Sequence, residues 1–227
     1  HLAASSIWVF VADVLLKKAD TKQSDADHLA SVEQNFIQLV SMPVGVLEKA
    51  VAPGHNGMGG IPVRSAAHTL VAVVQCFSSK PHSARVLLSK RILGALPCAM
   101  AIIKSAAVGG IQEGSGKVAQ NLIQLFISCF DVLSKEMGDE LILSTIKDFV
   151  AIYSDPSAMR TLSVDAGGSL MELFALLARR PGKKFQVLAL QVIQFCIGIW
   201  PNLSAGQSEL THDSILQLMV KVMRYQR

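Results

Sequence analysis

Charge is scarce in this chain, and strand-like alternation of apolar and polar residues is nearly absent. Charged residues make up 17% of the 227 residues and aromatic residues 6%, whereas hydrophobic residues make up 51%. Together with a mean hydropathy of +0.41, this composition excludes intrinsic disorder. The 16 glycines and 8 prolines follow no period, which excludes a collagen-like chain. We therefore expect a folded chain, apolar enough to be one part of a larger structure.

Motifs that would indicate an enzyme or a metal site are also missing. The four cysteines include no Cys-x-x-Cys pair, and the histidines have no partner at metal-ligand spacing. Gly116-Lys117 resembles part of a phosphate loop, but Ile111 and Val118 occupy the required glycine and hydroxyl positions. We expect no catalytic residue, no cofactor and no metal, and free thiols in a reducing compartment of the cell.

Long hydrophobic runs are absent as well. The longest apolar stretches, 7–16 and 185–200, are shorter than the ~20 residues that a membrane-spanning helix needs. The second stretch also contains three glutamines. We therefore expect a core helix there and no insertion into a membrane.

Helical periodicity dominates what is present. Apolar residues recur at i, i+3, i+4 and i+7 along most of the chain, which predicts an all-α fold. A first helical turn would begin at each of four prolines, Pro43, Pro81, Pro97 and Pro156. Asp155 is a good N-cap for the helix that begins at Pro156. The predicted helices are 2–18, 27–41, 44–52, 63–79, 82–94, 97–107, 117–134, 140–153, 156–179, 184–200 and 209–225.

Glycine indicates where the connectors lie, and at Gly167-Gly168 it leaves open whether a helix is broken. Two glycine-rich stretches, near 53–62 and 108–116, predict flexible connectors. Gly167-Gly168 precedes a capping-box pattern and would suit a break, but the apolar phase continues through both glycines, which favours one long helix. Short connections between so many helices are typical of either a globular bundle or a stack of helical hairpins.

Two segments carry a resemblance that favours the stack. Val63-Arg64-Ser65-Ala66-Ala67-His68-Thr69-Leu70 resembles the second helix of a HEAT repeat, and residues 155–170 resemble it more closely, with an Asp-Pro turn and an apolar-Arg pair. Arg64 and Arg160 lie 96 residues apart, about two HEAT periods of ~40–47 residues. The resemblance covers about a quarter of the chain. It implies one segment, 1–227, of a right-handed superhelical stack of about five antiparallel hairpins, a HEAT/ARM-like solenoid cut from a longer array.

The long, irregular hairpins are most similar to the karyopherin-β family of importins and exportins. That resemblance implies a non-enzymatic nuclear transport receptor in cytoplasm and nucleus, whose partners are cargo, the GTPase Ran and nucleoporins. The alternative is a HEAT-type scaffold or adaptor that binds an acidic partner, tubulin or nucleic acid, through basic loop tips.

Basic residues gather in two places that suit the alternative. No acidic residue occurs between Glu48 and Glu113, and residues 179–184 place four cations around a Pro-Gly turn. Cations on solvated helix faces would look the same. The candidate partner-binding residues are Arg179, Arg180, Lys183, Lys184, Lys80, Arg85, Lys90 and Arg91.

Overall fold

The protein is all-helical throughout the part that its structure, a computed structural model, describes. That part is residues 26–52, 60–76, 82–108, 114–178, 180, 182–203 and 211–225; the predicted helix 2–18 lies outside it. The elements are α2 (Ala26–Val51), α3 (Gly60–Cys76), α4 (His82–Ala107), α5 (Ser115–Val132), α6 (Asp139–Ser154), α7 (Pro156–Ala178), α8 (Lys183–Ile199), the 3-10 turn η1 (Trp200–Asn202) and α9 (His212–Tyr225).

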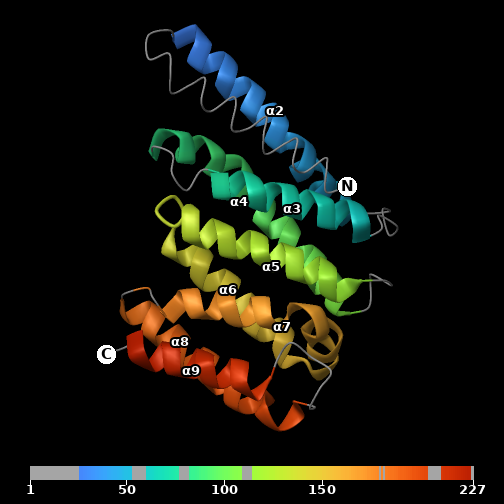
Figure 1. Cartoon of the computed structure of the whole chain (residues 1–227), viewed down its shortest axis with the longest axis vertical. Helices are drawn as coiled ribbons and strands as arrows, with labels where there is room; N and C mark the ends of the chain where they lie inside the picture. The colour runs from blue at the N-terminus through green and yellow to red at the C-terminus, as the bar shows by residue number, and fades with distance from the viewer. Residues whose placement is uncertain are drawn as a thin grey trace.

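These helices form two rows. In the odd row, α3, α5, α7 and α9 each pack against the next member, so that α5 lies between α3 and α7. In the even row, α2 packs on α4, and α6 contacts α4 and α8. Several neighbours in sequence also pack across the rows, such as α2 with α3 and α4 with α5. Figure 1 shows the helices following one another along the long axis, from α2 at one end to α8 and α9 at the other.

Aromatic contacts join the two rows at recurring places. Phe126 of α5 meets Phe149 of α6 edge to face, with 5.3 Å between ring centroids. One hairpin later, Phe174 of α7 meets Phe195 of α8 in the same way at 5.9 Å. Edge-to-face pairs place a positive ring edge against a negative ring face. Each pair therefore fixes one odd helix to the even helix beside it.

The predicted breaks at Pro43 and Pro97 are wrong. Each proline lies inside a single helix, α2 or α4, so the two pairs of helices predicted around them are one helix each. An interior proline removes one backbone hydrogen bond and costs about 3 kcal/mol. Val40 and Leu47 are both buried on either side of Pro43. Burying such side chains contributes about 1.5–3 kcal/mol each, which offsets the proline.

Two other predictions about helix boundaries are confirmed. Helix α7 runs without interruption through Gly167 and Gly168. It begins at Pro156, and Asp155 caps it: Oδ1 accepts hydrogen bonds from the backbone N–H groups of Ser157 at 2.8 Å and Ala158 at 3.0 Å. These bonds lower the pKa of the Asp155 carboxyl.

The connectors are shorter than the sequence predicts. Helix α3 begins at Gly60 and α5 at Ser115, so the ends of both predicted glycine-rich connectors are first helical turns. The centres of the two connectors, 53–59 and 109–113, lie outside the described residues. None of the described helices combines the length and the apolarity that crossing a membrane requires.

Candidate interaction surfaces

Arg180, in the turn between α7 and α8, is tied to the body of the protein. Its Nη2 donates a hydrogen bond to the carbonyl oxygen of Phe130 at 3.3 Å, and its guanidinium lies 5.7 Å from the ring centroid of Phe185. Burial lowers the pKa of Arg180, against the opposing field of Asp139. A half-buried guanidinium with these contacts holds the turn onto the end of α5.

Lys184 is also engaged within the chain. Its Nζ lies 2.6 Å from Oε1 of Glu140 at the start of α6. The hydrogen bond and the attraction between the charges raise the pKa of Lys184 and lower that of Glu140. Of the remaining two candidates in this turn, Lys183 is exposed and Arg179 lies outside the described residues.

The candidates near α4 lie elsewhere in the molecule. Lys90 and Arg91 are exposed on α4. Arg85 lies on the same helix, but the structure describes only its backbone. Lys80 precedes the helix and is not described. Helix α6 lies between α4 and α8, so the structure does not bring these cations and the 179–184 turn into one site.

A groove along the odd row was missed by the sequence reasoning. It has a volume of about 570 Å³ and crosses four helices, from Gln75 of α3 to Lys221 of α9. Gln124 lies in it and donates to Ser169 Oγ at 3.0 Å and to Glu172 Oε2 at 3.3 Å. One signal was present: the polar residues Gln124, Ser128 and Asp131 follow one another at steps of four and three on α5, which places them on one face of that helix. Its polar lining suits a partner that presents hydrogen-bonding groups.

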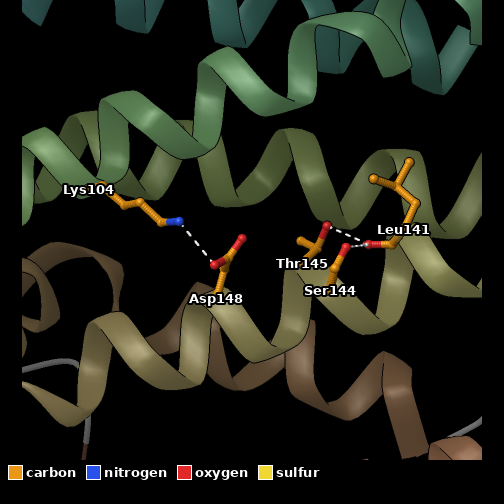
Figure 2. A network of polar contacts seen from close by, with 5 residues as sticks. All are labelled: Lys104, Leu141, Ser144, Thr145 and Asp148. Carbon is orange, nitrogen blue, oxygen red and sulfur yellow. Dashed lines mark hydrogen bonds and ion pairs between the residues drawn. The ribbon is translucent and has the colours of Figure 1, made fainter.

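Two further grooves separate successive helices of the even row. Between α4 and α6, a groove of about 290 Å³ is crossed by the ion pair between Lys104 Nζ and Asp148 Oδ1, 3.0 Å apart. Figure 2 shows this pair and, nearer the start of α6, the hydroxyls of Ser144 and Thr145, which both donate to the carbonyl oxygen of Leu141. Because these hydroxyls are bonded to their own helix, the groove is less polar than its residues suggest.

The groove between α6 and α8 is larger, at about 570 Å³, and is lined by polar and apolar side chains. Tyr153 of α6 is one of its lining residues. Burial raises the pKa of the Tyr153 hydroxyl, which finds no hydrogen-bond partner among the described residues. Gln191 and Gln194 line the groove from α8.

The described residues offer little for metal or thiol chemistry. No three histidine, cysteine, aspartate or glutamate side chains gather there as a metal site would require. Cys129 and Cys196 are buried, and burial raises the pKa of Cys196 to about 11, so this thiol stays protonated near neutrality. Cys76 and Cys98 are half-buried.

Comparison with known proteins returned no similarity: no family model, no curated protein and no solved structure matches this chain.

Proposed function

We propose that the chain is a non-enzymatic protein-interaction scaffold, built as a HEAT/ARM-like solenoid with a right-handed superhelix. The observation that carries the proposal is the spacing of side-chain contacts between neighbouring helices of one row. Lys104 and Asp148 lie 44 residues apart, as do Glu140 and Lys184, and Gln124 bonds a serine 45 residues onward. A HEAT or armadillo repeat has a period of ~40–47 residues.

The placement of the two HEAT-like segments supports the same proposal. Arg64 lies on α3 and Arg160 on α7, two members of the odd row that flank α5. Segments two periods apart belong in one row with one member between them. In such an array each hairpin buries its apolar face against its neighbours, and the long surfaces bind partners.

The odd-row groove is the surface that we assign to a partner. It extends over four helices, and Asp131, Glu172 and Lys221 supply charge along its lining. These side chains are exposed in the free protein. A bound partner would bury them, and a mismatched partner would leave them unpaired, which gives specificity. In the transport-receptor form of the proposal, this surface takes cargo or Ran, and the protein acts in cytoplasm and nucleus.

Affinity capture tests the transport form. The immobilised protein is offered cell extract together with Ran loaded either with GDP or with a non-hydrolysable GTP analogue. We expect the captured proteins to differ between the two forms of Ran. Capture of the same proteins in both cases contradicts the transport form and leaves the scaffold proposal in place.

Matched charge reversals test the groove. Glu172→Lys changes the groove lining, whereas Glu48→Lys makes the same change on the exposed surface of α2. We expect Glu172→Lys alone to weaken the captured interactions. Equal capture by both variants contradicts the assignment of this groove. If Lys183→Glu and Lys90→Glu abolish capture instead, and binding falls steeply with salt, the result supports an acidic partner bound by these exposed cations.

A further inference from the structure

Exposed large apolar side chains gather at one end of the stack. Among the described residues, helices α8 and α9 carry half of them, although most of the chain lies elsewhere. Both helices lie at the end of the molecule opposite α2 (Figure 1). The six side chains, 48–61% exposed, are Val187, Leu190, Ile197, Leu216, Val220 and Met223.

The outer face of α9 has an ordered pattern of charge as well. Its buried face consists of Ile215, Leu218 and Val222. On the opposite side, at steps of three, four and four residues along one stripe of the helix, lie Asp213, Leu216, Val220 and Arg224, all exposed. The stripe is acidic at the helix start, apolar in its middle and basic at its end.

We propose that this stripe binds a second copy of the same chain, with the two α9 helices antiparallel about a two-fold axis. In that arrangement Asp213 of each copy lies opposite Arg224 of the other, and Leu216 of each lies opposite Val220 of the other. A two-fold interface requires a surface complementary to itself. A stripe with opposite charges at its two ends and apolar residues between them meets that requirement only in the antiparallel direction.

The available area suits a weak dimer. Helices α8 and α9 are ~25 and ~21 Å long at 1.5 Å per residue, and two adjacent helices present a face of about 500 Å². Two such faces bury about 1,000 Å², the lower limit for a specific interface. A groove of about 400 Å³ between α8 and α9, lined by Leu190 and Met223, is open to side chains of the second copy.

Sedimentation equilibrium on the whole chain tests the proposal. We expect the wild-type protein to dimerise reversibly and Val220→Lys to be monomeric at the same concentration. Val164→Lys is the matched control, because Val164 is 49% exposed on α7 and lies outside the stripe. A wild-type protein that stays monomeric at several hundred micromolar, or equal dissociation by both lysine variants, overturns the proposal.

A charge exchange tests the antiparallel direction. Arg224→Glu places two carboxylates together at each end of the interface, and we expect the dissociation constant to rise on the order of tenfold. Asp213→Lys combined with Arg224→Glu restores opposite charges, so we expect the double variant to regain dimerisation. Helicity and the thermal midpoint are measured for each variant. A folded double variant that dimerises no better than Arg224→Glu contradicts the antiparallel pairing. If the double variant is unfolded, an equimolar mixture of Arg224→Glu and Asp213→Lys takes its place, because each end of an antiparallel mixed dimer again pairs opposite charges; no gain in dimerisation on mixing contradicts the pairing.

Discussion

Asp165 of α7 lies directly against the backbone of Gly116 in the first turn of α5. A Cβ atom at position 116 would stand 2.6 Å from the Oδ2 of Asp165 and 3.0 Å from its Cβ. Glycine is therefore required at this contact between the two odd-row helices.

Gly116→Ala should destabilise the protein by about 1–3 kcal/mol, because the added methyl group forces α5 and α7 apart. Combining it with Asp165→Ala should recover part of that loss, since the clashing atoms are removed. Gly94→Ala is the control: it also lies inside a helix, and a Cβ there meets nothing within 4 Å. We expect Gly94→Ala to stabilise by up to about 1 kcal/mol. Urea unfolding measures all four proteins, and equal effects at 94 and 116 would contradict the close approach.

Tyr153→Phe should leave stability unchanged or raise it by up to about 1 kcal/mol. The hydroxyl is buried without a hydrogen-bond partner among the described residues, so removing it relieves a desolvation cost while the ring remains in place. Tyr153→Ala should instead cost about 3–5 kcal/mol, as expected for the loss of a buried aromatic ring. If Tyr153→Phe lost more than about 1 kcal/mol in thermal or urea unfolding, the hydroxyl would have to make a bond in the folded protein.

Arg180→Ala should destabilise by about 1 kcal/mol, because it removes the hydrogen bond to the Phe130 carbonyl and the contact with the Phe185 ring. Arg180→Lys should rescue little, since an ammonium group cannot reproduce a planar guanidinium over a ring. Lys183→Ala, which changes an exposed cation at the first residue of α8, should be nearly neutral. Calorimetry on the three variants distinguishes a structural arginine from one that only adds charge.

The Asp155 cap should make stability depend on pH in acid. Its pKa is lowered in the folded protein, so its contribution is fully present above the pKa of the unfolded chain and is lost as pH falls through the folded value. Asp155→Ala should lower the thermal midpoint at pH 7 by about 2–4 °C. Asp155→Ser should restore most of that loss, because a serine hydroxyl also caps.

At pH 2 the wild-type protein and Asp155→Ala should unfold at more similar temperatures than at pH 7. A difference between them that did not shrink on acidification would assign the effect to packing rather than to the ionised carboxylate.

The helices from α5 to α8 were predictable within about two residues, because apolar spacing is a local signal and, for α7, the Asp155 cap is local as well. Pro43 and Pro97 were misread because a local rule about proline was outweighed by packing on distant helices. The basic turn shows the same limit. The clustering of its cations is visible in the sequence. The partners of Arg180 and Lys184, however, lie 50 and 44 residues away along the chain, so the sequence does not reveal them. The odd-row groove depends on which four helix faces meet, and no single segment encodes that.

The unequal packing of the two rows has a mechanical consequence. Along the odd row, the helices are in continuous contact and α5 is buried on most of its surface, whereas grooves separate α4 from α6 and α6 from α8. When the molecule bends, we expect the odd row to keep its length, because its helices are packed together. The spacing between α4 and α6 and between α6 and α8 should change instead. The exposed ion pairs Lys104–Asp148, between α4 and α6, and Glu140–Lys184, between α6 and α8, must adjust with these movements, and salt weakens such pairs.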